Sequence, residues 1–487
     1  MDLHLLICIA YFICMGVLGA WGIHRILLLH WFRYPAPPID SHQCHQPSVL
    51  VQLPVYNEAA VIGRLIDAVA QLDWPNLRIQ VLDDSTDETS SLAATRVDYW
   101  LSQGIQISHI QRKTRSGYKA GALAEGLTLD NSDFIGIFDA DFVPEKDFLK
   151  QMMVSFASPQ TGMVQARWGH LNRDQSWLSR IQSMMLDGHF LIEHTARYRT
   201  GRFFNFNGTA GIWRRKAIED AGGWSHDTVT EDLDLSYRAQ MAGWSFVYRD
   251  DVVAPAEVPG SMQAFLTQQH RWAKGTVQTA RKLLGPLLQA PLPWSVRLEA
   301  SNHLTMVLAY PFVFTLALLL PVSISARSAL FSEGMAWLDL FAILATTVSI
   351  SCFYAAALRC GGEHLRHRWW EIPLAMAVGI GCSGGQALAV IEGMFSNDAT
   401  FVRTPKQGSS GKVVLVARNR TSRLLITGGM TAYYVIAIMW IVHGEYWTSL
   451  PFVFLFGSGF AINFMNCCLE GGHTEGVGEM GGAPAAK

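Results

Sequence analysis

Hydrophobic and polar positions divide this chain into three parts. Leu5 to Ile23 is a run without charged residues that is long enough to cross a bilayer. Between Ser48 and Gln289 short apolar runs alternate with helical patterns, and after Gln289 long uncharged runs return. We therefore expect an N-terminal membrane anchor, a water-facing domain and then a bundle of membrane helices.

The middle part has the alternation that is typical of an α/β fold. Four apolar runs predict strands, and three stretches with helical periodicity separate them. This alternation predicts a mostly parallel sheet with right-handed crossovers. The predicted strands are Ser48–Leu53, Arg78–Leu82, Ile105–Ile110 and Phe134–Phe138, and the predicted helices are Glu58–Leu72, Glu88–Gln103 and Lys119–Leu129.

The last part contains four uncharged runs that we interpret as membrane spans. Two prolines in the first of these runs, Pro311 and Pro321, are tolerable in such helices. With the N-terminal run they give five spans and a C-terminus on the inner side. The runs are Leu304–Ala326, Leu340–Leu358, Leu424–Val442 and Tyr446–Leu469.

A further uncharged run, Ile372 to Ile391, is harder to place. Basic residues flank it on both sides, and basic flanks favour the cytoplasmic face. Four glycines also interrupt it, so we predict an interfacial or re-entrant segment, with a sixth span as the alternative. The glycines are Gly379, Gly381, Gly384 and Gly385.

Charge sets the orientation of the first run. Lys and Arg are absent before it, whereas Arg25 and Arg33 follow it. A cleaved signal peptide has the opposite order, so we expect an uncleaved anchor and a cytosolic domain. The expected parts are the anchor at 1–34, a linker at 35–47, the α/β domain at 48–289, membrane helices at 290–470 and a disordered tail at 471–487.

Composition agrees with this division and argues against some classes of function and site. The chain has 487 residues, of which 50% are hydrophobic and only 16% are charged, which favours a membrane protein. A net charge of -2 gives no bulk attraction to nucleic acid. The eight cysteines form no Cys-x-x-Cys pair, so neither a structural zinc site nor a disulfide framework is indicated.

Candidate chemistry begins at Phe138-Asp139-Ala140-Asp141, which follows the fourth predicted strand. Ligands of open α/β sheets bind at the carboxyl ends of the strands. Two carboxylates there suit a hard cation that is shared with substrate phosphates. A surface pair that caps the next helix is the alternative.

The first two strands end in polar residues at the same edge. Tyr56, Asn57 and Glu58 follow the first strand, and Asp84 follows the second. Such a crevice suits a nucleotide, with Asp84 or Asn57 on the base or ribose. Asp87 is the better candidate for the helix cap, which leaves Asp84 as the better ligand.

Three further stretches carry polar groups at helix starts or within helices. Lys119 stands among glycines at a helix start, where anions bind, although a solvated lysine is the alternative. Thr230 can cap a helix, and Asp232 after it can act as a general base. Gln268, Arg271 and Trp272 lie in a helical stretch in which Arg can neutralise a diphosphate and Trp can stack on a sugar.

The order of these motifs, followed by membrane spans, resembles the processive family 2 glycosyltransferases, which include cellulose, chitin, hyaluronan and mannan synthases. The resemblance is closest to the cellulose-synthase-like mannan and glucan synthases, and it covers roughly Val49 to Leu284. It rests on the stretches Gln80–Asp87, Gly117–Leu123, Ile137–Phe142, Val164–Trp168, Phe206–Trp213 and Gly222–Trp224.

This resemblance implies a GT-A-like domain and a role for each matching residue. Asp84 matches the nucleotide-binding aspartate, and Asp139 and Asp141 match the aspartates for the diphosphate and for Mg²⁺ or Mn²⁺. Asp232 matches the catalytic base. The motif that holds the diphosphate and the acceptor sugar is matched by Gln268, Arg271 and Trp272.

A stretch near the C-terminus, Phe401–Lys406, resembles the gating loop of these synthases and gives a gating-loop-like segment at 394–423. Arg403 and Pro405 depart from the simpler Val-Thr pattern that is usual there.

The expected function is that of a membrane-embedded inverting glycosyltransferase. It takes hexose from UDP-glucose or GDP-mannose and extends, and translocates, a β-linked polysaccharide with an expected β-1,4 linkage. The alternatives are transfer of one sugar to a membrane lipid and, less favoured, a transporter or scaffold. We prefer a bacterial inner membrane to a Golgi membrane. The donor, the oligomeric state and any export partner stay open.

Overall fold

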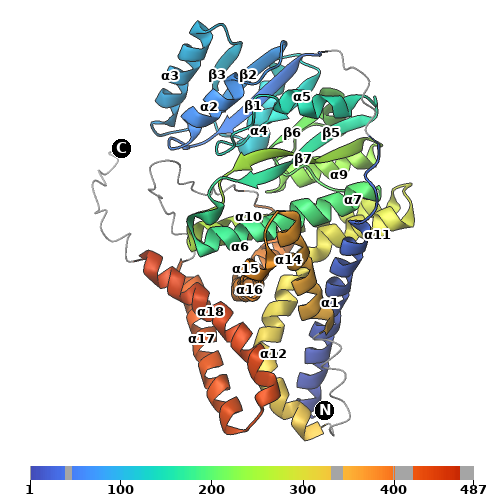
Figure 1. The fold of residues 1–487 in the computed structure, drawn as a ribbon, viewed down its shortest axis with the longest axis vertical. Coiled ribbons are helices and arrows are strands. Elements are labelled where there is room, and N and C mark those ends of the chain that lie inside the picture. Colours follow the sequence, from blue (N-terminus) through green and yellow to red (C-terminus); the bar gives the residue numbers. More distant parts are fainter. Residues whose placement is uncertain (1, 39–45, 331–343, 399, 401–419, 472–487) are drawn as a thin grey trace, which may run out of the picture.

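The computed structural model describes residues 2–38, 46–330, 344–398, 400 and 420–471. An α/β domain lies at one end of the molecule, and long helices extend away from it toward the other end (Figure 1). The N-terminus and the turn between the last two long helices lie at the end farthest from the sheet. The first helix therefore runs toward the α/β domain.

The domain is built on a seven-stranded sheet in the order β3-β2-β1-β4-β6-β5-β7. The four strands that the sequence predicts form a parallel half, and β6 pairs antiparallel with both β4 and β5. The strands are β1 Val49–Val55, β2 Leu77–Asp83, β3 Ile107–Gln111, β4 Phe134–Ile137, β5 Thr161–His170, β6 Gly211–Arg214 and β7 Ser245–Ala256.

Helices cover both faces of this sheet (Figure 1). The three helices that the sequence predicts between the first strands are present. The helices of the domain are α2 Ile62–Ala70, α3 Thr89–Ser102, α4 Tyr118–Thr128, α5 Phe148–Met153, α6 Trp177–Asp187, α7 Thr195–Arg199, α8 Arg215–Asp220 and α9 Glu231–Met241, with a π-helical turn at Gly188–His194 that joins α6 to α7.

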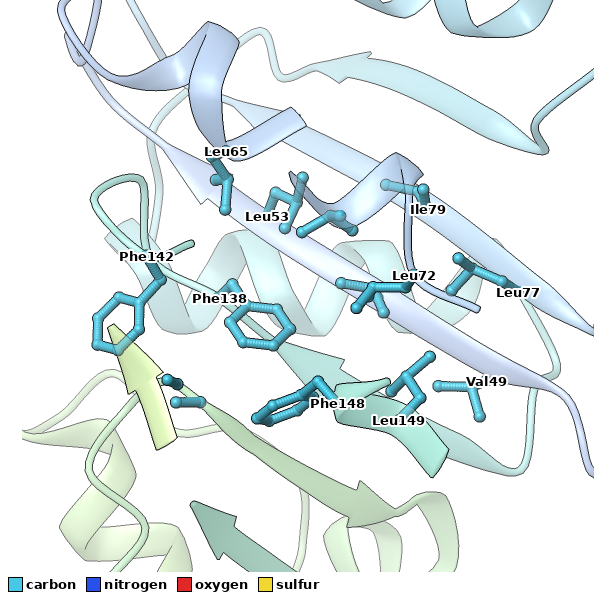
Figure 2. Packing of buried hydrophobic residues seen from close by; sticks show 14 of the residues in the cluster. Val49, Leu53, Leu65, Leu72, Leu77, Ile79, Phe138, Phe142, Phe148 and Leu149 are labelled. Atoms are coloured by element: carbon cyan, nitrogen blue, oxygen red, sulfur yellow. The ribbon is translucent and has the colours of Figure 1, made fainter. Parts of the chain in front are cut away.

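The larger core cluster lies between the sheet and the helices α2, α3 and α5. Figure 2 shows part of it, with Phe138 and Phe148 in edge-to-face contact at a centroid distance of 5.1 Å. Phe138 directly precedes Asp139 and is fully buried. Its burial fixes the end of β4 and so the start of the Asp-x-Asp loop.

The remaining helices form the second part of the molecule. The long helix α10 runs beneath the sheet and connects the two parts. The helices are α1 Leu3–Trp31, α10 Met262–Gln289, α11 Trp294–Thr305, α12 Ala309–Leu330, α14 Ser349–Cys360, α15 Leu365–Arg368, α16 Glu371–Phe395, α17 Arg420–His443 and α18 Leu450–Gly471.

Among the described residues five helices are long and apolar enough to cross a membrane: Leu3–Trp31, Trp294–Arg327, Glu371–Phe395, Thr421–His443 and Trp447–Leu469. The chain is therefore a multi-pass membrane protein. Of the span expected at 340–358 the structure describes only 344–358, so that span stays a prediction.

The glycines of the 372–391 run do not interrupt it, contrary to our expectation, because α16 is one continuous helix. Gly381 and Gly384 serve close packing instead, whereas a Cβ atom on Gly379 or Gly385 would meet no described neighbour within 4 Å. A Cβ atom on Gly381 would lie 2.2 Å from the carbonyl oxygen of Gly459 in α18. A Cβ atom on Gly393 would lie 2.7 Å from the carbonyl oxygen of Lys274 in α10.

Helix α16 is also more enclosed than the other four long helices. Its most apolar window is 67% buried, against 28–33% for the others. It contacts α10, α12 and α18. Its length and hydropathy fit the alternative of a sixth span, and the interfacial or re-entrant placement stays a prediction.

Candidate active site

The carboxyl ends of the parallel strands meet at a cavity of about 160 Å³. All the predicted site residues except Asn57 line it, although they come from six separate segments of the chain. They are Tyr56, Glu58, Asp84, Lys119, Asp139, Asp141, Asp232, Gln268, Arg271 and Trp272.

Asn57 lies beside the cavity and joins two strand ends. Its backbone N–H donates to the Ser85 hydroxyl at 2.9 Å, and its side-chain oxygen accepts from the Thr86 N–H at 2.8 Å. Its φ of 55° lies in the left-handed region that Asn tolerates. These contacts assign Asn57 to the turn geometry, so its expected contact with a nucleotide stays a prediction.

Asp84 points into the cavity wall and is paired with Arg112. The Arg112 Nε atom donates to Asp84 Oδ1 at 2.7 Å, and Nη2 bonds the other carboxylate oxygen. Both side chains are only 5% exposed. Asp87, by contrast, accepts from the Thr89 N–H at 2.9 Å just before α3, but the N-cap position of that helix is Glu88.

Lys119 is enclosed in the site, which excludes the solvated alternative. Its Nζ atom donates to Asp139 Oδ1 at 2.5 Å and to the Gly208 carbonyl oxygen at 2.9 Å. Burial opposes its charge, but Asp139, Glu231 and Asp232 outweigh burial and raise the pKa of Lys119. The lysine therefore stays cationic and supplies fixed positive charge next to the Asp-x-Asp loop.

The two aspartates of that loop differ in exposure. The Asp139 side chain is 38% exposed, while Asp141 is almost completely buried. The Asp139 N–H donates to the Thr209 hydroxyl at 2.9 Å, which ties the loop to the segment before β6. Asp139 therefore presents its carboxylate to a ligand, and Asp141 lies deeper in the wall.

Asp232 lies in the first turn of α9, next to Glu231. Burial and the Glu231 carboxylate raise the pKa of Asp232 to about 7, although Lys119 opposes the shift. A carboxylate with a pKa near neutrality is a suitable general base. A Cβ atom on Gly208 would lie 3.0 Å from Asp232 Oδ2, so only glycine leaves the carboxylate this space.

Thr230 does not cap α9 with its side chain, contrary to our expectation. Its hydroxyl instead lies 3.1 Å from the Thr279 hydroxyl of α10. The reason is the close approach of α10, because a Cβ atom on Gly275 would lie 2.5 Å from Thr230 Cγ2. Tertiary packing has here replaced a local cap.

Helix α10 supplies Gln268, Arg271 and Trp272 from one face. Ser261 caps its first turn by accepting from the Ala264 N–H at 3.2 Å. Burial lowers the pKa of Arg271, and nearby Glu231 and Asp139 counter that effect. An arginine remains charged after such a shift, so it adds a second cation to the cavity.

A second cavity of about 310 Å³ adjoins the first. Asp232, Gln268 and Trp272 line both cavities. From there the second cavity extends to Tyr310 in α12 and Tyr354 in α14. A path of polar and aromatic side chains therefore leads from the candidate base to the membrane helices.

Sequence reasoning missed several residues that line or support the site. Arg115 lines the first cavity, and its guanidinium lies 3.4 Å from the centroid of the Tyr56 ring. Arg112 and Arg115 follow β3, so the strand-end rule applied to β1 and β2 was sufficient to find them. Asn207 lines both cavities, and its buried Oδ1 atom accepts no hydrogen bond from the part of the chain that the structure describes, but no periodic pattern in the sequence identifies it.

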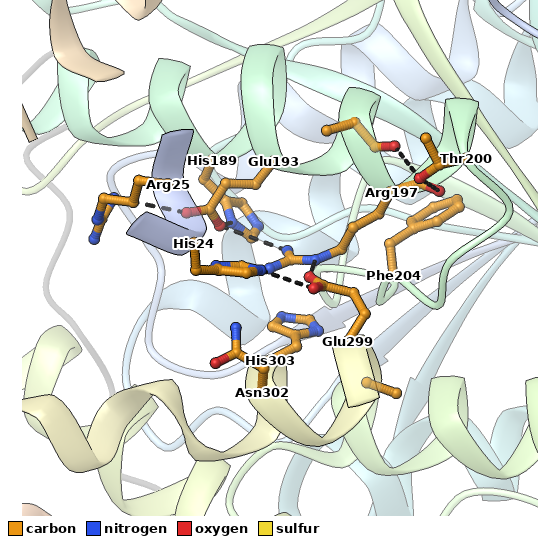
Figure 3. Close-up of polar contacts among 12 residues, drawn as sticks. His24, Arg25, His189, Glu193, Arg197, Thr200, Phe204, Glu299, Asn302 and His303 are labelled. Carbon is orange, nitrogen blue, oxygen red and sulfur yellow. Dashed lines mark hydrogen bonds and ion pairs between the residues drawn. The ribbon is translucent and has the colours of Figure 1, made fainter. Parts of the chain in front are cut away.

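A buried network of charges borders the second cavity and joins three parts of the fold (Figure 3). Arg197 Nε donates to Glu299 Oε1 at 3.0 Å, and His24 Nε2 lies 2.7 Å from Glu299 Oε2. Arg197 Nη1 lies 3.6 Å from a Glu193 carboxylate oxygen. The network therefore links α1 and α11 to the helix that continues from α6.

The residues present suit a divalent cation. Within the described ranges no three His, Cys, Asp or Glu side chains are close enough to hold a metal ion by themselves. Two carboxylates, one of them exposed to the cavity, leave coordination positions for phosphate oxygens and water. Mg²⁺ and Mn²⁺ at phosphate sites use this kind of incomplete protein ligand set.

Comparison with known proteins agrees with this geometry. Residues 46–275 match the family model described as glycosyltransferase like family 2. Glucomannan 4-beta-mannosyltransferase 2 of Arabidopsis thaliana is 44% identical over 263 residues, which are 52% of this chain and 49% of that protein. Glucomannan 4-beta-mannosyltransferase 7 of the same plant is 43% identical over 259 residues, 52% of this chain and 47% of that protein.

The chain spans about half the length of the curated relatives it matches. A solved mannosyltransferase from Pyrobaculum calidifontis, in complex with GDP-Man and Mn²⁺, superposes with a TM-score of 0.56. The match covers 81% of this chain and 99% of that chain at 21% identity, so it shows the fold. The GT-A-like prediction is confirmed. Residues 46–275 of this chain therefore form a glycosyltransferase-like family 2 domain that is similar in sequence to the glucomannan 4-beta-mannosyltransferases.

Proposed function

We propose that this protein is a membrane-embedded inverting glycosyltransferase that extends a β-1,4-linked mannan from GDP-mannose. The observation that carries the proposal is the shared wall of the two cavities. Asp232 and Trp272 lie between a pocket that contains the Asp-x-Asp loop, Lys119 and Arg271 and a second cavity that reaches the membrane helices. A donor in the first pocket would meet an acceptor from the second at Asp232.

The chemistry assigned to the chain's own residues is a single displacement. Asp232 accepts the proton of an acceptor hydroxyl while that oxygen forms a bond to the anomeric carbon of the donor sugar. The bond from the anomeric carbon to the diphosphate oxygen breaks, and the leaving diphosphate takes the electron pair. Lys119 and Arg271 lie where their fixed charge stabilises that leaving group.

Asp139 and Asp141 are the residues that would hold Mg²⁺ or Mn²⁺. A bound ion would supply further positive charge to the diphosphate. The mannosyltransferase from Pyrobaculum calidifontis carries Mn²⁺ together with GDP-Man, which supports the choice of cation and donor.

The relatives' names favour one of the two donors that the sequence left open. Both plant relatives are named as mannosyltransferases that form a 4-beta linkage. We therefore place GDP-mannose before UDP-glucose. The second cavity supports translocation of the growing chain, with the catalytic domain on the cytosolic side. The gating-loop-like stretch at Phe401–Lys406 lies outside the described residues.

The test is sugar transfer by the purified full chain in detergent. Labelled GDP-mannose and UDP-glucose are supplied in parallel with Mn²⁺, with Mg²⁺ and with EDTA, and the product is sized and digested with a β-1,4-mannanase. We expect high-mass, mannanase-sensitive product from GDP-mannose that EDTA abolishes. A single-sugar lipid product would refute the polysaccharide proposal, and transfer only from UDP-glucose would refute the donor.

A further inference from the structure

A third cavity, of about 220 Å³, lies between α10, α16, α17 and α18. It does not include Asp232 or the Asp-x-Asp loop. Its polar lining comes from all four helices, and Leu266 and Leu388 add apolar wall. The polar side chains are His270, Gln386, Glu392, Arg423, Thr427 and Asn463.

Three of these side chains carry buried atoms that have no hydrogen-bond partner among the described residues. Asn463 is fully buried and its Oδ1 atom is unbonded, as is Oε1 of Gln386, which is 4% exposed. Arg423 Nη1 is buried without a partner too. Buried polar groups in folded proteins are nearly always bonded, so this set indicates a ligand that accepts from Arg423 and donates to the two amides.

The charges that line the cavity further restrict the class of ligand that fits it. Arg423 supplies one positive charge, and Glu392 supplies one negative charge from a carboxyl group that is 43% exposed. His270 Nε2 lies 3.6 Å from Glu392 Oε2. A simple anion would face Glu392 and a simple cation would face Arg423, so the pair suits a ligand that carries both signs.

The position of the cavity indicates that such a ligand comes from the membrane lipids. Arg423 lies in the first turn of α17, at the end of that helix nearest the α/β domain (Figure 1). Basic residues at this end of a membrane helix lie at the level of lipid headgroups. Leu388 and Ile391 of α16 are 43% and 50% exposed, so apolar surface continues beside the cavity.

We propose that this cavity binds the headgroup of a zwitterionic aminophospholipid, a phosphoethanolamine ester. The phosphate accepts from Arg423, and the primary ammonium donates to Glu392, Gln386 and Asn463. A choline headgroup has no N–H to donate, and a phosphoglycerol headgroup leaves Glu392 without a counter-charge. The headgroup would hold α17 and α18 against α16 and α10.

The first test measures lipid binding by the full chain in detergent, using native mass spectrometry with phosphatidylethanolamine, phosphatidylcholine and phosphatidylglycerol. We expect phosphatidylethanolamine to bind in preference to the other two, and Arg423→Gln to weaken its binding by about tenfold. Arg359→Gln is the matched control, because Arg359 is an exposed arginine at the end of α14. Equal binding of the three lipids, or no effect of Arg423→Gln, would overturn the proposal.

A second variant tests the charge argument separately. Glu392→Gln leaves the cavity with an excess positive charge, so the preference should move from phosphatidylethanolamine to phosphatidylglycerol. Soluble phosphoethanolamine and inorganic phosphate form the last arm. If either soluble compound bound at the concentration used for the lipid, a lipid would not be required as the ligand. The binding readout is independent of sugar transfer, so failure of the proposed function would leave this test intact.

Discussion

Burial raises the pKa of Asp232 and has two consequences. The side chain becomes a suitable general base, and its ionised form destabilises the fold. We expect Asp232→Asn to lower the rate of sugar transfer by about 10²- to 10⁴-fold, since an amide cannot accept the proton. Transfer from GDP-mannose under saturating donor checks this. Asp220→Asn, an exposed carboxylate of the same domain, is the control and should transfer at the parental rate. A rate for Asp232→Asn within threefold of the parent would remove Asp232 from the mechanism.

The pKa of Asp232 predicts the pH dependence of the same reaction. The ionised carboxylate is the active form and its pKa is about 7, so the rate should rise with pH up to about 7 and level off above it. The profile is measured as kcat/KM, which reports groups of the free enzyme. A flat profile between pH 5 and 8 would contradict the assignment.

Ionisation of Asp232, which increases the rate, should decrease the stability of the fold. The folded-state pKa of Asp232 lies above the ordinary value of an aspartate, so ionisation costs folding free energy as pH rises from about 4 to 7, and the cost is constant above 7. Asp232→Asn removes this cost. Its gain in Tm over the parent should therefore grow from pH 5 to pH 8, which thermal unfolding in detergent measures. A gain that shrinks over that range would contradict the buried-charge argument.

At the scale of elements, the glycines of α16 determine how closely its neighbours approach. Gly381→Ala puts a methyl group on the backbone of α18, which cannot rotate away, so we expect a loss of about 1–3 kcal/mol in the free energy of unfolding. Gly385→Ala is the matched control, because a Cβ atom there meets nothing within 4 Å. It should be neutral or slightly stabilising, since Ala favours a helix over Gly. Equal effects of the two substitutions would contradict the packing role.

The elements also show how far sequence patterns reach. Periodicity predicted β1 to β4 and the helices α2 to α4, because each contributes buried apolar residues to one of the two core clusters of the domain. The strand-end rule then placed the polar residues that follow β1, β2 and β4 at one edge, whereas Lys119, Asp232 and the residues of α10 were assigned from helical stretches and from the resemblance. Periodicity did not predict β7. The middle of this strand contains Arg249, Asp250 and Asp251, and its pairing with β5 shifts register. The pairing of Asp84 with Arg112 and the displaced Thr230 cap depend on contacts between distant segments, which no local pattern contains.

For the whole molecule, the central question is what fixes the α/β domain on its membrane helices. The network around Arg197 performs this role, since it connects α1, α11 and the helix that continues from α6 (Figure 3). The Arg197 side chain is 0% exposed and that of Glu299 is 3% exposed. A buried ion pair contributes little over an apolar pair, but the loss of one partner leaves a charge without compensation.

This asymmetry predicts that single and double substitutions in the network change stability differently. Glu299→Met leaves Arg197 buried with only the more distant Glu193, so we expect a loss of about 3–5 kcal/mol in the free energy of unfolding. Glu219→Gln, in an exposed pair at 4.0 Å, is the control and should change stability by less than about 1 kcal/mol. The double variant Arg197→Met/Glu299→Met should recover most of the loss, because it removes the uncompensated charge and retains side-chain volume. Denaturant unfolding of the four proteins measures these differences. If the double variant were no more stable than Glu299→Met, the loss would come from packing at Glu299, and the network would not act as an electrostatic link between the domain and the membrane helices.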